Sequence, residues 1–424
     1  MTRALTSRNR AGPTGLHYGW IIVFVGVLTV MASLGMGRFA LGMLLPSMSA
    51  SLPLSYAEMG FISTGNFVGY LLSVLGVGPL ERRFGARAMI SSGLFLVGLS
   101  MMLVAFAQSF SQVLVLYFLT GLGSGCANVL MLALVPHWFG RVRRGRAAGL
   151  IVSGSGFGII FGGLMVPWIN QAAGAEGWRA SWVMLATASL IIAVLAMILV
   201  RNHPADKGLS PLAARDGVPG PEPGRRPPEE PEPMAAGQKA RLLLHLGGIY
   251  MAFGYTYAIY ATFVVTTLVQ EYGLPEANAG LYWAWIGFFS LFSGPLFGTL
   301  SDRWGRPAAL MLVFTVHACS YLLIALSSDI RAVYLSVLLF GIGAWAVPGI
   351  MAAAAGDYMG PKHAAAAFGV ITFVFGIGQI AGPAVAGVLA EWQQSFTGSY
   401  LMAAAVAVVA VLLSAGLRKP PERD

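Results

Sequence analysis

The chain has 424 residues, of which 57% are hydrophobic and only 10% are charged, and its mean hydropathy is +0.73. Soluble domains carry about 25% charged residues, so a soluble fold of this size could not bury so much apolar surface. The formal charge of +9 is distributed over short basic segments between apolar runs, which is a membrane-topology pattern and argues against nucleic acid as a partner. The composition therefore predicts an integral membrane protein in contact with the lipid bilayer.

The apolar runs are long enough to cross a bilayer as helices. A spanning helix needs about 20 mostly apolar residues, because lipid offers no partner for a free backbone group. The first run, from Trp20 to Leu45, is too long for the core of a signal peptide and indicates an uncleaved first span. Twelve spans are expected in chain order, near residues 18–46, 56–78, 87–108, 111–135, 146–169, 180–200, 243–270, 279–299, 307–327, 331–355, 364–390 and 396–417.

The positions of the basic residues support this count. All 26 lysines and arginines except Arg38, Arg179 and Arg331 lie in the two tails or near the loops that follow even-numbered spans. Basic loops stay on the cytoplasmic side, so we expect both termini to be cytoplasmic in a multi-pass protein of a bacterial inner membrane. With an odd number of spans, the basic loops would have fallen on both sides of the membrane.

One long hydrophilic stretch divides the chain. Residues 203–240 hold nine of the 23 prolines, and a segment of this composition cannot bury a core, which predicts a disordered cytoplasmic linker. The expected organisation is a tail (1–17), a six-helix bundle (18–202), the linker (203–240), a second six-helix bundle (241–418) and a tail (419–424).

The two predicted bundles are related by an internal repeat with a constant offset of 220 residues. Duplicated halves around a site at the membrane midplane are typical of secondary transporters, because rocking one half against the other exposes the site to each side in turn. The predicted fold class is therefore all-α, with twelve transmembrane helices in two pseudo-symmetric six-helix bundles. Glycines that coincide across the offset include Gly78 and Gly298, Gly85 and Gly305, Gly121 and Gly341, and Gly162 and Gly382.

Two motifs of the second bundle resemble those of the major facilitator superfamily. Residues 298–306 resemble the family's loop motif between helices 8 and 9, and residues 378–387 resemble its antiporter-type glycine–proline motif. Residues 37–46 and 66–70 resemble a largely uncharacterised bacterial branch, and residues 138–149 are similar to the monocarboxylate and oxalate–formate transporters. Those transporters typically carry an arginine on helix 8, where this chain has none.

The resemblance implies a charged latch that closes the cytoplasmic side. In the second half, Asp302 occupies the family's aspartate position and can pair with Arg303, Arg306 or a helix N-terminus. In the first half an arginine stands at that position and Glu81 lies one residue early, about 100° around a helix, so we expect the second half to carry the latch. The gating residues implied are Gly78, Arg83, Gly298, Asp302, Arg303, Gly305, Arg306, Gly382 and Pro383.

Arg38 is the one basic residue within a span that the resemblance assigns to the cavity wall. It lies about 27 Å beyond Trp20 along a helix, in the outer half of the membrane. Two interpretations remain open: the arginine binds an anionic group in the cavity, or its side chain extends to the membrane surface. Across the repeat Arg38 maps onto Ala258, and Tyr255 and Thr262 share the helical face of Ala258. We expect their hydroxyls to lie opposite the arginine.

Other polar and aromatic side chains are weaker candidates, for which ordinary packing is the alternative. Asn66 and Tyr70 share one face of the second span. No Asp or Glu lies in the middle of a predicted span, so the substrate brings the proton, the protein exchanges anions, or coupling uses a group at the end of a span. The predicted substrate-binding residues are Arg38, Asn66, Tyr70, Asn128, Tyr255, Thr262, Trp283, Trp345 and Gln379.

These patterns predict a secondary active transporter that moves a small solute by alternating access. The presence of Arg38 favours an organic anion such as a carboxylate, and the alternative is efflux of drug-like or apolar compounds, with Trp283, Trp285 and Trp345 forming an aromatic pocket. Six scattered histidines offer no catalytic cluster for a membrane enzyme, and only a flux assay separates a transporter from a receptor of the same fold. We expect no cofactor or metal, and a monomer.

Overall fold

The computed structural model describes residues 17–212, 236–360 and 363–417, which are helical apart from turns and one isolated β-bridge. Eleven continuous segments among these residues are long and apolar enough to cross a membrane. One of them, Arg143–Leu199, has 57 residues, and as a single helix it would be about 85 Å long, far more than a bilayer needs. A turn at Gly174, with a φ of 72°, divides it into two passes. The described residues therefore make the predicted twelve passes.

The N-terminal half contains six passes. The first consists of α1 (Gly19–Val30), the π-helix η1 (Met31–Phe39) and α2 (Ala40–Ser51). The next three are α3 (Tyr56–Phe84), α4 (Ala86–Val104) and α5 (Phe110–Trp138), the fifth is α6 (Arg141–Val152) with α7 (Gly154–Ala173), and the sixth is α8 (Gly177–Leu199). Two short 3₁₀ turns, η2 (Gly174–Glu176) and η3 (Pro204–Lys207), precede and follow α8.

The C-terminal half repeats this arrangement. Its passes are α9 (Ala236–Gln270), α10 (Glu276–Trp304), α11 (Arg306–Leu326), α12 (Ile330–Gly343) with α13 (Ala346–Met359), α14 (Ala364–Gln393) and α15 (Thr397–Ala415). Gly85 and Gly305, which the offset of 220 residues relates, both form the turn after the second pass of their half, with φ of 80° and 87°. A positive φ favours glycine, so the repeat predicted from the sequence is also a repeat of backbone geometry.

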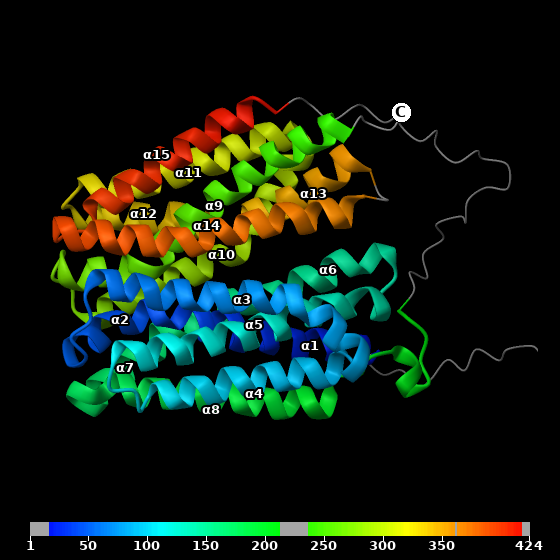
Figure 1. The fold of residues 1–424 in the computed structure, drawn as a ribbon, viewed down its shortest axis with the longest axis horizontal. Coiled ribbons are helices and arrows are strands. Elements are labelled where there is room, and N and C mark those ends of the chain that lie inside the picture. Colours follow the sequence, from blue (N-terminus) through cyan, green and yellow to red (C-terminus); the bar gives the residue numbers. More distant parts are fainter. Residues whose placement is uncertain (1–16, 213–235, 361–362, 418–424) are drawn as a thin grey trace, which may run out of the picture.

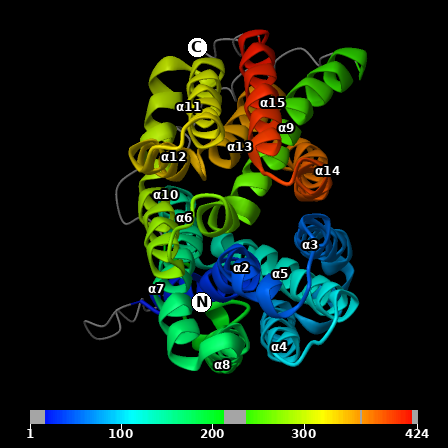
Figure 2. The same ribbon diagram turned by 90° about the vertical axis from the view of Figure 1, so that its left-hand side faces the viewer.

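The two halves form separate bundles that meet along the middle of the molecule (Figures 1 and 2). In Figure 2, α11, α12 and α15 lie at the top of the view and α4 and α8 at the bottom. The contact between the halves is made by α3 with α14, α7 with α10, and α2 with α9. The interface is therefore built from the first, second and fifth passes of the N-terminal half and the seventh, eighth and eleventh passes of the chain.

The described part of the predicted linker is ordered. After η3, Leu212 pairs with Phe139 in an isolated parallel bridge, in which Leu212 N donates to Trp138 O at 2.9 Å and Gly140 N donates to Leu212 O at 3.2 Å. At the other end of the linker, α9 already begins at Ala236. The expectation of disorder over residues 203–240 does not fit these ends, because backbone hydrogen bonds and the packing of Leu212 against the apolar core of the first half anchor residues 203–212. Residues 213–235 lie outside the described residues.

The helices end at two faces of opposite charge. Glu271, Glu276 and Glu391 lie at the acidic end, and the turns after α3 and α10 together with α6 lie at the basic end. Toward the basic end, α6 and α13 are apart in Figure 1. Several hydrogen bonds between the halves lie level with the middle of the bundle or nearer the acidic end. They include Ser47 to Glu276 (3.2 Å), Asn170 to Glu276 (2.6 Å), Tyr56 N to Glu391 (2.8 Å), Ser63 with Thr262 (2.9 Å), Thr64 to Ile380 O (2.9 Å) and Gln270 to Ser49 (3.2 Å). This conformer is closed at the acidic end.

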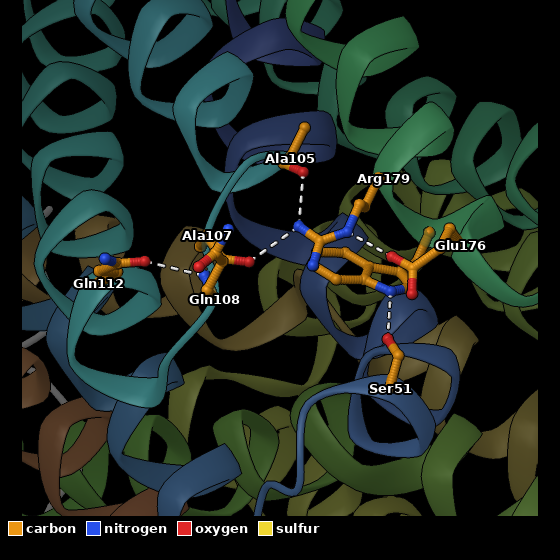
Figure 3. A network of polar contacts seen from close by, with 8 residues as sticks. Ser51, Ala105, Ala107, Gln108, Gln112, Glu176 and Arg179 are labelled. Atoms are coloured by element: carbon orange, nitrogen blue, oxygen red, sulfur yellow. Dashed lines mark hydrogen bonds and ion pairs between the residues drawn. The ribbon is translucent and has the colours of Figure 1, made fainter.

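Arg179 is a basic residue at the acidic end, and its contacts give a structural reason for this position. At the start of α8 its guanidinium pairs with Glu176 and donates to the carbonyl oxygens of Ala105 and Ala107 at 2.8 Å each (Figure 3). Hydrogen bonds from a charged donor are about twice as strong as neutral ones. Arg179 therefore joins the turn before α8 to the α4–α5 turn at the acidic end.

Candidate functional site

The π-helix η1 carries Arg38 near its C-terminal end. Short π-helical segments often occur at functional sites, and their wider turns change which backbone groups are bonded within the helix. Three side chains of α3 and α5 donate to carbonyl oxygens of this segment. They are Ser124 to Ser33 O at 2.7 Å, Asn66 to Gly37 O at 3.4 Å and Tyr117 to Arg38 O at 2.7 Å. Backbone groups within a membrane need partners, so these bonds stabilise η1 and fix the position of Arg38.

The Arg38 side chain lies against aromatic rings of α3. Its guanidinium carbon is 4.1 Å from the centroid of the Tyr70 ring and 4.9 Å from that of Phe67. Its Nε and Nη2 atoms are buried without a hydrogen-bond partner, and no carboxylate pairs with the arginine within the described residues. The Tyr70 hydroxyl accepts from Asn128 Nδ2 at 2.9 Å, which holds the ring in place. The structure thus brings together three predicted residues, Arg38, Tyr70 and Asn128.

The C-terminal half contributes Tyr257 of α9 and Gln379 of α14. Gln379 donates to the Tyr257 hydroxyl, and this hydroxyl lies close to the Arg38 guanidinium. The predicted partner Tyr255 is not placed there, because its hydroxyl contacts Met402 Sδ of α15 at 3.2 Å. Two residues are about 200° around an α-helix, so Tyr255 and Tyr257 point to opposite sides. The repeat misled the prediction because η1 changes the helical phase in the first pass, whereas α9 has no such segment.

A small pocket lies beside Arg38. It has a volume of about 10 Å³, room for about one water molecule, and its lining includes Arg38, Ser63 and Thr262. The Ser63 and Thr262 hydroxyls are 2.9 Å apart across the interface, so Thr262 helps to close this pocket. A larger cavity of 550 Å³ lies by the α4–α5 turn, and it includes none of the predicted site residues. We therefore place the site by the chemistry around Arg38 and not by cavity size.

Trp345 lies at the break between α12 and α13 and faces the same region. Its ring is 5.3 Å from that of Phe39 and 6.1 Å from that of Tyr257, and its Nε1 is buried without a partner. Trp283 is 1% exposed, whereas Trp285 is 46% exposed. Since these two tryptophans are about 200° apart around α10, the structure does not gather the three tryptophans of the efflux alternative into one pocket.

Asn66 supports the site from behind. It is 1% exposed, and its Nδ2 donates to Tyr117 O at 3.2 Å as well as to Gly37 O. Trp283, with an unpartnered Nε1, packs in a hydrophobic core to which both halves contribute. In the structure these two predicted residues pack around the site and do not line its polar centre.

Comparison with known proteins identifies the family. The family model described as the Major Facilitator Superfamily matches residues 27–383 and residues 246–424. The chain belongs to this superfamily. It is 25% identical over 389 residues to the hexuronate transporter of Bacillus subtilis (strain 168), across 88% of this chain and 89% of that protein. It is 23% identical over 411 residues to monocarboxylate transporter 2 of Homo sapiens, across 93% and 84% of the two chains.

The solved structures agree in fold. The nucleoside transporter NupG superposes with a TM-score of 0.72 at 13% identity, covering 94% of this chain and 98% of that one. The family and its transporter relatives make this superfamily member a multi-pass membrane transporter of small solutes and not an enzyme.

Two predicted gating residues of this facilitator lie at the closed interface. A Cβ at Gly382 would be 2.3 Å from Tyr255 O of α9, so α14 approaches α9 closely there. Pro383 O lies 2.3 Å from the position of a Cβ at Gly60 on α3. Residues 382–383 therefore join α14 to its own half and to the opposite half, and a side chain at Gly60 would force the halves apart.

The superfamily loop motif of the second half forms a charge cluster at the basic end. Arg306 donates to Asp302 Oδ1 at 2.6 Å, to Asp357 Oδ2 at 2.7 Å and to Ser301 Oγ at 2.9 Å. The Arg306 side chain is 16% exposed and that of Asp302 is 70% exposed. The cluster therefore ties the turn after α10 to α13.

The other predicted gating residues lie near this cluster or at the corresponding turn of the first half. A Cβ at Gly78 or Gly298 would meet no heavy atom within 4 Å, and Arg303 is exposed. The Arg83 guanidinium lies 5.3 Å from the Phe84 ring. Glu81 forms no salt bridge within the described residues. The positions related by the offset to Asp302, Arg306 and Asp357 hold Arg82, Ala86 and His137, so the first half lacks the charges for such a cluster.

Sequence reasoning missed Tyr257 and the π-helix. Tyr250, Phe253 and Tyr257 recur at helical spacing on α9 and all stack on Phe375 of α14, with centroids 4.3, 5.9 and 6.1 Å away. This aromatic stripe was a readable signal that Tyr257 shares the face of α9 that meets α14. No comparable signal marks η1, because its stability depends on donors from distant passes.

The charge cluster predicts a difference between the two loop motifs. Asp302→Asn should lower solute uptake about two- to fivefold, since it removes one partly exposed ion pair while Asp357 still holds Arg306. Glu81→Gln should leave uptake unchanged. Uptake into proteoliposomes, normalised to the amount of inserted protein, measures both. Equal losses in the two variants would contradict the assignment of the latch to the second half.

Proposed function

We propose that this facilitator is a secondary active transporter of a small organic anion, a carboxylate, and that Arg38 binds the anionic group. The observation that carries the proposal is the guanidinium between the two halves with two unpartnered nitrogens. Each buried donor without a partner costs about 1–3 kcal/mol, and removing the charge from water costs several kcal/mol more. The two cation–π contacts return only about 1–2 kcal/mol each. The balance favours binding of an anion.

The position of the site supports alternating access. Arg38 and Tyr70 belong to the N-terminal half, and Tyr257 and Gln379 belong to the C-terminal half. A solute that contacts both groups is sensitive to the rocking of one half against the other, which is how a transporter couples binding to exposure of the site. The hexuronate and monocarboxylate transporters among the relatives are named for carboxylates, which also supports an organic anion.

We propose that the basic end faces the cytoplasm of a bacterial inner membrane and that both termini are cytoplasmic. The basis is the tendency of basic segments to remain inside. The conformer, closed at the acidic end, would then be inward-facing. Because one chain supplies both sides of the site, we also propose that the transporter acts as a monomer. Light scattering of the purified protein should give the mass of one chain, and the mass of a stable dimer would refute this.

The orientation is tested by accessibility of cysteines in intact cells. In a Cys319→Ser background, which removes the exposed native thiol, Ala277→Cys at the acidic end should react with a membrane-impermeant maleimide. Ala205→Cys in η3 at the basic end should react only after the cells are made permeable. The parental Cys319→Ser chain is the control, since Cys126 is buried. The reverse pattern of labelling would overturn the orientation.

The anion-binding role predicts that Arg38→Lys is not a conservative change. Lysine keeps the charge but lacks the planar pair of donors, so loss of a two-point contact should weaken carboxylate binding by about 2–4 kcal/mol, roughly 30- to 1000-fold. Arg38→Gln should abolish uptake. Thermal-shift titration with a panel of carboxylates measures affinity, and Arg331→Lys at an exposed position is the matched control. Normal uptake by both Arg38 variants would refute the proposal.

A further inference from the structure

Three of the unpartnered polar atoms near Arg38 are hydrogen-bond donors. Arg38 Nε and Nη2 and Trp345 Nε1 are buried without hydrogen-bond partners. Trp345 reaches this region through its ring contacts with Phe39 and Tyr257. A carboxylate has two oxygens with about four lone-pair sites, so a single carboxylate group can accept from all three donors. The polar part of the site is thus matched to one carboxylate and needs no second charged group.

The amide nitrogens of the other polar side chains at the site already donate within the protein. Asn128 donates to Tyr70, and Gln379 donates to Tyr257. The Asn66 amide nitrogen bonds backbone oxygens of η1 and α5 behind Arg38. A hydroxyl group of a ligand would have to compete for these donors, and each buried hydroxyl without a partner is unfavourable.

Aromatic rings form the rest of the surroundings. Phe67 and Tyr70 flank the guanidinium from α3, and Phe39 lines the small pocket beside Arg38. The Trp345 ring lies 5.3 Å from that of Phe39. On the opposite half Tyr257 continues into the stack with Phe375. Flat apolar groups pack against such rings in offset or edge-to-face arrangements, with a gain beyond the area that they bury.

We infer that the substrate is a monocarboxylate with a flat, apolar body, such as a single aromatic ring, rather than a polyhydroxylated sugar acid or a dicarboxylate. The carboxylate binds the three donors and the ring packs between Tyr70 and Trp345. This inference rests on the proposed anion-binding role of Arg38 and adds the class of solute to it. It assigns Trp345 Nε1 as a specificity-determining donor.

Four probes separate the charge of the ligand from its body. Benzoate carries both features, acetate carries the charge alone, D-galacturonate joins the charge to a polyhydroxylated body, and benzamide keeps the ring without the charge. Titration of the full-length purified protein, followed by thermal shift, should show that benzoate binds at least about tenfold more tightly than each of the other three. The same order should hold for competition against benzoate uptake in proteoliposomes.

Two tryptophan variants test the donor assignment. Trp345→Phe keeps a ring but removes the indole N–H, so it should weaken benzoate binding about tenfold. Trp285→Phe makes the same change at an exposed position of α10 and is the control for folding and insertion. Equal affinity of both variants for benzoate would overturn the role of Trp345.

The outcomes distinguish failure of the inference from failure of the proposed function. If D-galacturonate binds more tightly than benzoate and its binding is lost in Arg38→Gln, the solute class is wrong and the anion site stands. If benzoate binds equally well to the wild type and to Arg38→Gln, or if no carboxylate binds, both are wrong. Benzoate binding that requires Arg38 and weakens in Trp345→Phe supports both.

Discussion

A guanidinium held inside a membrane protein, with no carboxylate paired to it among the residues that the structure describes, is the constraint on which the transporter's chemistry depends. Arg38 lies between the two halves, its charge meets the faces of Tyr70 and Phe67, and two of its nitrogens have no partner. Cation–π contacts are worth about 1–2 kcal/mol each when desolvated and do not offset the several kcal/mol that desolvation of a charge costs. In the proposed function, an anion that arrives between the halves supplies the missing partner and links ligand binding to the interface that must open and close.

The duplicated scaffold carries a site that is not duplicated. The turns at Gly85 and Gly305 have the same positive φ in both halves, yet the π-helix occurs in the first pass while α9 is α-helical over all of its described length. The latch charges are likewise confined to the second half, where Arg306 joins Asp302 and Asp357. In the proposed mechanism, pseudo-symmetry supplies the motion, and departures from it supply the chemistry of binding and gating.

The sequence was sufficient for the fold and for part of the site. The span count follows from apolar length, and the pairing of the halves follows from the offset of 220 residues, because both depend on local composition. Arg38 was singled out because a charge in a span is rare, and Tyr70 because it shares a helical face with Asn66. The sequence pointed to Tyr255, but the structure places Tyr257 near Arg38. The direction in which Arg38 points depends on the π-helix η1, and η1 is stabilised by donors such as Tyr117 that are far away in sequence. The ordered linker residues up to Leu212 were missed for a similar reason, since their partners are backbone groups of the first half.

The most direct test of the account is a structure of the protein in lipid nanodiscs with the carboxylate that stabilises it most in thermal-shift titration. We predict density for the carboxylate about 3 Å from Arg38 Nε and Nη2, with the rest of the ligand between the rings of Tyr70 and Trp345. A ligand bound elsewhere, with the Arg38 guanidinium hydrated at the membrane surface, would contradict the central claim that this arginine is the anion-binding group of the transporter.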